Sequence, residues 1–144
     1  FTFKDHFKNQ LLVATVTGVV PYVSFVRNYL YLNRSGHHFF ILEGASYMDE
    51  FVYDKEFRSL SAQHPEMITF IPTVSRPGEP RNASWEGLHG RVNNIVEEQI
   101  GVLGLSTNNT MVYACGHPGM IEDVKSRLVP NGFEFLEERF WKED

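Results

Sequence analysis

The sequence has 144 residues, of which 42% are hydrophobic and 22% charged, and its formal net charge is −5. These values are typical of one globular domain with a sizeable core, and the length is too short for two ordinary domains. The negative charge, with no basic stripe along the chain, argues against a nucleic-acid-binding protein.

The first strand and the turn after it form a candidate ligand site. Residues 11–16 are apolar apart from one threonine, as in a strand buried on both faces. Thr17 and Gly18 follow, and Pro21 fits the first turn of a helix that we expect to end near Leu32. Glycine there lets backbone N–H groups approach a phosphate at the positive end of the helix. A tight turn without a ligand explains a single glycine equally well, so both interpretations stay open.

Two further strands precede the middle of the chain. Residues 38–42 form the second, followed by a helix that starts after Ser46 and ends near residues 64–65. Residues 67–74, rich in β-branched and aromatic side chains, form the third strand. The loop 75–90 holds two prolines and three glycines. Loops of this length in compact domains are usually functional or mobile.

Basic residues lie on both sides of this loop. Ser75 and Arg76 end the third strand, and a guanidinium fork with a hydroxyl beside it suits a phosphate. Arg91 begins the next predicted helix, residues 91–100, where the helix dipole opposes a cation. An arginine at this unfavourable position indicates a functional role for Arg91. Two solvated surface arginines are the commoner outcome for any such pair, and that alternative stays open.

The turn at residues 115–120, Cys-Gly-His-Pro-Gly-Met, joins a fourth strand (110–115) to a helix (121–128). Its small residues let a ligand approach the backbone. A phosphatase-type cysteine would need an arginine six positions on, where Ile121 stands, and a redox Cys-x-x-Cys is excluded because the chain has one cysteine. A small core thiol is the usual interpretation. The position of Cys115 at the end of a strand favours a thiol that faces a ligand.

The chain closes on a strand that starts at residues 133–135 and continues toward Trp141. Glu138, Phe140 and Trp141 place an aromatic pair beside a carboxylate, which either caps the sheet or stacks on a flat cofactor. Strands alternate with helices throughout, which predicts a parallel sheet with helices on both faces. The two glycine turns would then form a bipartite site for one elongated ligand.

Several features bear on compartment and extent. One cysteine allows no intrachain disulfide, so we expect a reducing compartment, the cytoplasm. No apolar run approaches the roughly 20 residues of a membrane span, and no signal peptide is visible. The six histidines show no metal-ligand spacing, so we expect no metal. The chain begins Phe-Thr-Phe rather than with Met, and we expect it to be part of a longer protein.

Taken in order, these segments resemble the nucleotide-binding domain of the ferredoxin–NADP(+) reductase family. The resemblance covers about residue 9 to residue 141, nearly the whole chain. Each motif is moderately specific, and five in the right order are strong. The matching segments are 15–21 (family pattern T-G-T-G-x-x-P), 44–53 (second strand-to-helix segment), 74–76 with 90–92 (adenosine-phosphate segment), 115–120 (C-G-x-P-x-M) and 138–141 (aromatic C-terminus).

The resemblance implies a three-layer α/β/α fold with a five-stranded parallel sheet in the order 3-2-1-4-5. It implies that residues 1–144 form one NAD(P)-binding domain, which passes hydride between NADPH and FAD and electrons on to a one-electron carrier such as ferredoxin or flavodoxin. The family's FAD-binding barrel lies N-terminal, and its R-x-Y-S-type strand is absent from this chain. We therefore expect half of an enzyme, inactive without the FAD domain of the same polypeptide.

The resemblance also implies roles for single residues. The pyrophosphate would lie near Thr17 and Gly18, and the nicotinamide by Cys115 and Gly116. Cys115 and Glu138 would flank the hydride path as catalytic residues, while Phe140 or Trp141 would shield the flavin. The 2′-phosphate would be held by Ser75, Arg76 and Arg91, favouring NADPH over NADH. The remaining cofactor-binding positions are Pro21, Gly44, Ser46, Pro118 and Met120.

Three departures from the family pattern leave alternatives open. Val16 replaces the first glycine of the loop, and either crowds the nicotinamide–flavin junction or reshapes the turn. Ser46 stands where some members carry an arginine for the 2′-phosphate, and residues 142–144 extend past the terminal Trp. The alternatives are an NADH-using electron-input module of an oxygenase or cytochrome reductase, and a noncatalytic nucleotide-sensing domain.

Overall fold

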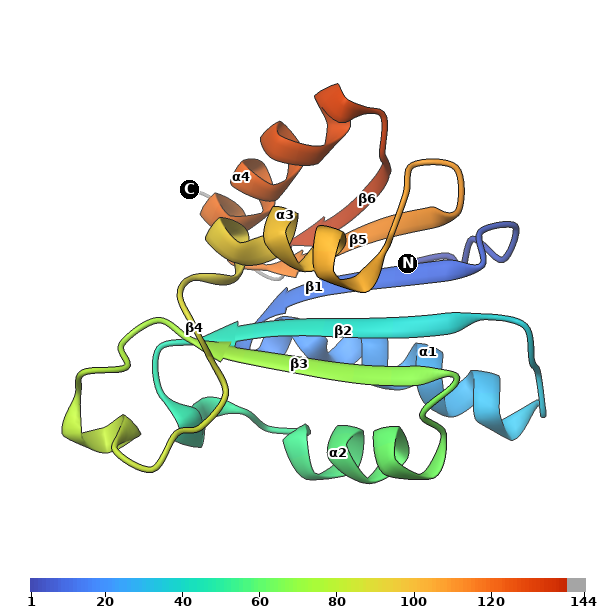
Figure 1. Cartoon of the computed structure of the whole chain (residues 1–144). Coiled ribbons are helices and arrows are strands. Elements are labelled where there is room, and N and C mark those ends of the chain that lie inside the picture. The colour runs from blue at the N-terminus through green and yellow to red at the C-terminus, as the bar shows by residue number, and fades with distance from the viewer. Residues whose placement is uncertain (140–144) are drawn as a thin grey trace.

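The structure, a computed structural model, describes residues 1–139 as one parallel sheet between helical layers (Figure 1). The strands are β1 (Asn9–Thr15), β2 (His38–Ala45), β3 (Ile68–Val74), β4 (Leu88–His89), β5 (Thr110–Gly116) and β6 (Glu134–Arg139). The α-helices are α1 (Val20–Tyr31), α2 (Asp54–Gln63), α3 (Val92–Leu103) and α4 (Pro118–Leu128). Short 3₁₀ helices are η1 (Val16–Val19), η2 (Met48–Glu50), η3 (Pro80–Asn82) and η4 (Val129–Asn131).

The sheet order is β4-β3-β2-β1-β5-β6, with every neighbouring pair parallel. The prediction of five strands in the order 3-2-1-4-5 was therefore wrong, because the two-residue β4 pairs with Thr73 and Val74 at the outer edge of β3. The five expected strands keep their predicted neighbours. A two-residue strand inside the loop 75–90 carries no hydrophobic period, so the sequence offered no sign of it.

The central strands are buried on both faces, which explains their nearly continuous apolar runs. In β1, Leu12 and Ala14 join a core cluster with residues of α1 and α2, whereas Leu11 and Val13 join a cluster with α3 and α4. Successive side chains of a strand point to opposite faces, so each face receives alternate residues. Figure 1 shows α3 and α4 above the sheet and α2 below it.

Three helix boundaries differ from the predictions. The chain after Ser46 first forms η2, and α2 starts only at Asp54. Helix α3 continues past residue 100 and ends where Gly104 adopts a left-handed conformation. Helix α4 begins at Pro118 rather than at 121, because the ring of His117 accepts a hydrogen bond from the Gly119 N–H and proline suits a first helical turn.

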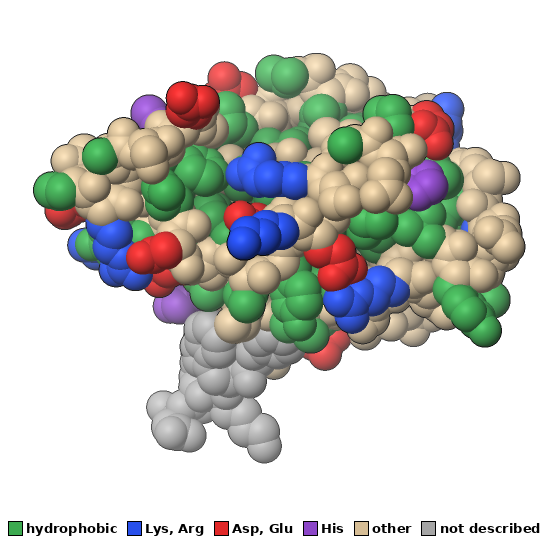
Figure 2. Space-filling model, turned by 90° about the horizontal axis from the view of Figure 1, so that it is seen from below, with side chains coloured by type: hydrophobic (Ala, Val, Ile, Leu, Met, Phe, Trp, Pro, Cys, Tyr) green, Lys and Arg blue, Asp and Glu red, His purple; other side chains and the backbone are tan. Residues whose placement is uncertain are grey.

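The face covered by α1 and α2 carries mixed charges. Figure 2 shows basic and acidic side chains interspersed there, with hydrophobic side chains between them. The ion pair between Arg27 and Glu56 joins α1 to α2. Within residues 1–139, no helix combines the length and apolar character that crossing a bilayer requires.

Candidate functional site

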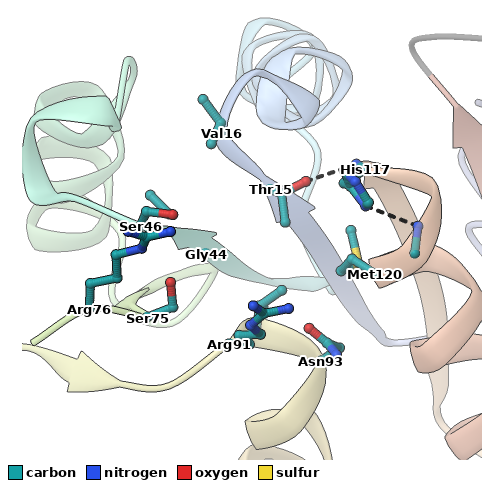
Figure 3. Close-up of a pocket in the computed structure, with 13 residues that line it drawn as sticks. Thr15, Val16, Gly44, Ser46, Ser75, Arg76, Arg91, Asn93, His117 and Met120 are labelled. Carbon is teal, nitrogen blue, oxygen red and sulfur yellow. Dashed lines mark hydrogen bonds between the residues drawn. The ribbon is translucent and has the colours of Figure 1, made fainter.

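A cleft of about 500 Å³ opens at the carboxyl ends of β1, β2, β3 and β5 (Figure 3). Strand β1 has β2 on one side and β5 on the other, so the chain order of the sheet reverses there. Open α/β sheets bind ligands in the crevice beyond the carboxyl ends at such a switch point. The predicted cofactor-binding residues that line the cleft are Gly44, Ser46, Ser75, Arg76, Arg91 and Met120.

Two arginines of this cleft have no acidic partner. Within residues 1–139, Arg76 and Arg91 form no ion pair, whereas five other arginines do. Those five are Arg27, Arg34, Arg81, Arg127 and Arg139. Arg76 Nη1 donates a long hydrogen bond of 3.4 Å to the Tyr47 hydroxyl, and Arg91 is the N-cap residue of α3. Two exposed cations beside the hydroxyls of Ser46 and Ser75 are suited to bind an anion.

Glycine at position 44 gives α3 its close approach to the sheet. A Cβ there would lie 2.9 Å from the Cβ of Val92, closer than real Cβ atoms come. The N-terminus of α3, with Arg91 and Asn93, is thereby held against the floor of the cleft. Because the helix N-terminus presents unpaired N–H groups, its position adds to the attraction for an anion.

The two glycine turns contact each other rather than a shared cavity. Gly18 is buried, and a Cβ there would lie 2.3 Å from the Cys115 carbonyl oxygen. Gly116 has a φ of +130°, and its Cβ would lie 2.3 Å from Thr15 Oγ1. That hydroxyl oxygen accepts a hydrogen bond of 2.9 Å from the His117 N–H. Both glycines therefore permit close backbone packing between η1 and the end of β5.

Some predicted residues lie outside the cleft lining. Among the described residues these are Thr17, Gly18, Pro21, Cys115, Gly116, Pro118 and Glu138. Thr17 is exposed, whereas Pro118 is buried in the first turn of α4. Phe140 and Trp141 fall outside the described residues. The roles of these residues toward a nucleotide or a flavin therefore stay predictions.

Val16 lines the cleft in a strained backbone conformation. Its φ of +44° lies in the left-handed region, which a β-branched residue rarely adopts. Its side chain packs, with Met48 and Trp85, on a small hydrophobic cluster that includes Phe51. The family pattern has glycine here, and the positive φ explains that choice. The departure thus keeps a glycine-like backbone and adds a side chain to the cleft wall.

This strain predicts an unusual order of stabilities. Exchanging Val16 for glycine is expected to give a protein about 1 kcal/mol more stable than exchanging it for alanine, since only glycine adopts a left-handed conformation without cost. Both variants lose the two methyl groups of valine and differ only in the Cβ, whose packing favours alanine, so a more stable glycine variant reports the backbone. Urea unfolding followed by circular dichroism measures it. A more stable alanine variant would contradict the assignment of strain.

The predicted catalytic pair is brought together on the other face of the sheet. Cys115 and Glu138 are register partners on β5 and β6, and Cys115 lies fully buried in the core beside α1. Burial, with a smaller contribution from the Glu138 charge, raises the pKa of the Cys115 thiol to about 12. The thiol is therefore protonated, which suits a positional role rather than nucleophilic attack. Glu138 is half-exposed and lies 3.0 Å from the amino group of Phe1.

The cleft also holds residues that the sequence patterns did not single out. Thr15 and His117 lie inside the motifs at 15–21 and 115–120 but have no predicted role of their own, whereas Asn93 lies outside every motif. Asn93 Nδ2 donates a 2.6 Å hydrogen bond to Asp123, which ties α3 to α4. In the sequence, their positions at the predicted strand ends and helix starts could have indicated that they lie at the cleft. Within residues 1–139, no group of three or more His, Cys, Asp or Glu side chains is placed to hold a metal ion.

Comparisons with known proteins agree with this geometry. The family model of the oxidoreductase NAD-binding domain matches residues 12–126. The chain is 29% identical over 125 residues to the nitrate reductase [NADPH] of Beauveria bassiana, covering 86% of this chain and 14% of that protein. It is 25% identical over 122 residues to ferredoxin–NADP reductase root isozyme 2 of Arabidopsis thaliana, covering 82% of this chain and 31% of the relative.

A solved structure shares the fold. The ferredoxin NADP+ reductase from Neisseria gonorrhoeae, with bound FAD and NADP, superposes with a TM-score of 0.75 at 19% identity, covering 94% of this chain and 57% of that one. The chain spans less than a third of the length of the two curated relatives, which it covers to 14% and 31%.

Proposed function

The chain belongs to the oxidoreductase NAD-binding domain family, the nucleotide-binding domain of ferredoxin–NADP reductase-like flavoproteins, and from this premise we propose that it is the NADP(H)-binding half of a flavin-dependent reductase. Hydride passes between NADPH and an FAD held by another domain of the same polypeptide. Electrons then continue to a one-electron carrier such as ferredoxin or flavodoxin. This chain supplies binding, orientation and electrostatics, because the redox chemistry belongs to the cofactors.

The observation that carries the proposal is the pair of arginines without counter-charges. Arg76 and Arg91 face the cleft beside the hydroxyls of Ser46 and Ser75 (Figure 3). A 2′-phosphate carries about two negative charges and several acceptor oxygens, which these donors match in charge and chemistry. A nucleotide without that phosphate would leave both cations uncompensated. The donor set therefore favours NADPH over NADH.

The other end of the cleft suits the rest of the nucleotide. Thr15, His117 and Met120 line it where β1 and β5 end, so the nicotinamide would lie there, beside Gly116. Thr17 is exposed at the η1 turn and would approach the pyrophosphate from the rim, whereas the buried Gly18 would hold that turn against the end of β5. Cys115 and Glu138 would flank the hydride path from the α1 side once the FAD domain is in place. The aromatic residues Phe140 and Trp141 would shield the flavin.

Replacing Arg76 with alanine is expected to weaken binding of 2′-phospho-AMP by roughly 10- to 100-fold and to leave 5′-AMP nearly unaffected. A hydrogen bond to a charged group contributes about 1.5–3 kcal/mol, which corresponds to such a factor. Titration calorimetry measures both affinities.

Arg58→Ala is the matched control for this test. Arg58 also lacks an ion pair within the described residues, but its guanidinium stacks on Phe70 away from the cleft. Its removal is expected to change neither affinity. Equal wild-type affinities for the two nucleotides, or no loss in Arg76→Ala, would count decisively against the 2′-phosphate site.

One observation favours a second candidate. Ser46 provides a hydroxyl where some family members place an arginine for the 2′-phosphate, which suits an NADH-using electron-input module of an oxygenase or cytochrome reductase. The ratio of kcat/KM for NADPH and NADH, measured on the flavoprotein that contains this chain, separates the two candidates. A ratio well above one supports NADPH, and a ratio below one supports the second candidate.

A further inference from the structure

We propose that Asn82 is a positioning residue that assembles the anion site by holding Ser46 and Arg76 together. The inference rests on the proposed function, because it concerns the same phosphate-binding residues. Asn82 ends η3, inside the long loop 75–90, and does not line the cleft itself. Its side chain is 2% exposed, so a polar amide is buried inside an otherwise exposed loop.

The amide of Asn82 uses both its donors and its acceptor on backbone groups. Nδ2 donates to the carbonyl oxygen of Ser46 and to that of Arg76, each at 2.9 Å. Oδ1 accepts from the Met48 N–H at 2.8 Å. One side chain thereby joins the segment that follows β2 to the segment that follows β3.

This junction lies where the sheet ends. The last backbone bond between the two segments runs from the Ser75 N–H to the Ala45 carbonyl oxygen, at 2.9 Å. Beyond it, among the described residues, no direct hydrogen bond joins Ser46 to Arg76. Beyond the last backbone hydrogen bond, the Asn82 amide therefore joins the two segments. It does so at Ser46 and Arg76, whose side chains are proposed to bind the phosphate.

A second contact fixes η3 in the same place. Arg81 forms a bidentate ion pair with Asp49 at 2.7 and 2.8 Å, and its guanidinium lies 4.1 Å from the centre of the Tyr47 ring. Arg76 lies over the same ring, at 5.7 Å. The loop is thus ordered before a ligand arrives, and a preorganised site loses less entropy on binding.

Asparagine is suited to this position by its chemistry. A terminal amide offers two donors and an acceptor on a short side chain. Aspartate has no donors when ionised and would face two carbonyl oxygens, and serine offers a single donor. The requirement explains why a buried asparagine, rather than another small polar residue, lies at the centre of this loop.

The test compares Asn82→Ala with Asn109→Ala by titration calorimetry with 2′-phospho-AMP and 5′-AMP. Asn109 is a matched control, because its side chain also bonds neighbouring segments, with Oδ1 accepting from the Ser106 N–H and the Thr110 hydroxyl, but at the opposite end of the sheet. Asn82→Ala is expected to weaken 2′-phospho-AMP binding at least 10-fold and 5′-AMP binding less than 2-fold. Asn109→Ala is expected to leave both affinities within 2-fold.

The double variant Asn82→Ala/Arg76→Ala separates a positioning role from a general loss of structure. Because part of the effect of Asn82 passes through Arg76, the double variant is expected to bind 2′-phospho-AMP more tightly than the sum of the two single losses predicts. Additive losses, equal losses for both nucleotides, or no loss in Asn82→Ala would overturn the inference. If the alanine variant does not fold, Asn82→Ser carries the same comparison, since serine keeps one oxygen but lacks the amide donors.

The wild-type preference for 2′-phospho-AMP tests the proposed function, and the preference of Asn82→Ala tests the positioning role of Asn82. A wild-type protein that binds both nucleotides equally would remove the proposed function, and the inference with it. A wild-type protein that prefers 2′-phospho-AMP, with Asn82→Ala keeping that preference, would overturn the inference alone.

Discussion

Replacing Glu43 with glutamine is expected to raise the free energy of unfolding at pH 9 by roughly 2–4 kcal/mol and to leave it nearly unchanged at pH 4. Glu43 lies in β2 and is fully buried, and neither carboxyl oxygen has a hydrogen-bond partner within the described residues. Alternation along β2 directs it to the same face as Ile41, toward α1 and α2. A buried carboxyl without partners is costly to ionise.

The direction of the effect follows from proton binding. Burial, and secondarily the negative charge of Asp54, raises the pKa of Glu43 from 4.5 to about 8. At a pH between these two pKa values, Glu43 is protonated in the folded protein and ionised in the unfolded chain. The stability of the wild type therefore falls as the pH rises from about 4.5 to about 8. Glutamine does not titrate, so the stability of the Glu43→Gln variant does not fall in this way as the pH rises.

Urea unfolding of both proteins from pH 4 to pH 9 measures the difference. Subtracting one profile from the other removes the titration of every other group. Glu98→Gln, a change at an exposed position of α3, is the control and is expected to keep the wild-type profile. A difference between wild type and Glu43→Gln that does not grow with pH would mean that the buried carboxyl finds a partner.

Replacing Gly18 with alanine is expected to destabilise the fold by about 3 kcal/mol and to abolish nucleotide binding. The new Cβ would lie 2.3 Å from the Cys115 carbonyl oxygen and 2.8 Å from the Gly116 Cα. Both are backbone atoms, so no side-chain rotation relieves the clash. Either η1 or the end of β5 must move, and the cleft-lining residues Val16 and His117 lie in η1 and directly after β5.

Gly101→Ala is the matched control for this variant. Gly101 lies in α3, and a Cβ at this position would meet no atom within 4 Å, so alanine there removes only the flexibility of glycine. That variant is expected to be up to about 1 kcal/mol more stable than the wild type. Thermal unfolding and calorimetry with 2′-phospho-AMP measure both variants. A Gly18→Ala protein with wild-type stability would show that η1 does not pack on β5.

Local patterns in the sequence predicted much of the fold. The apolar runs of β1, β2, β3 and β5 indicated buried parallel strands, and Pro21 indicated the start of α1. These features depend on neighbours along the chain, which a sequence shows directly. The order of five motifs indicated the family, because each motif preserves a local backbone requirement. The short β4 and the first turn of α4 were missed, since tertiary pairing and a cap define them.

The three-dimensional arrangement decided which of these residues meet. Gly18 has the sequence context of a phosphate-binding glycine, but its neighbour in space is the backbone of Cys115, much later in the chain. Arg76 and Arg91 stand out as an anion site only in the folded protein, because none of the residues among 1–139 that line the cleft carries a carboxylate. Asn82 carries no motif and joins two loops beside the cleft. Contacts between distant segments and the pairing of charges depend on distances in space, which no local pattern encodes, whereas strands, helices and turns follow from short-range preferences of the chain.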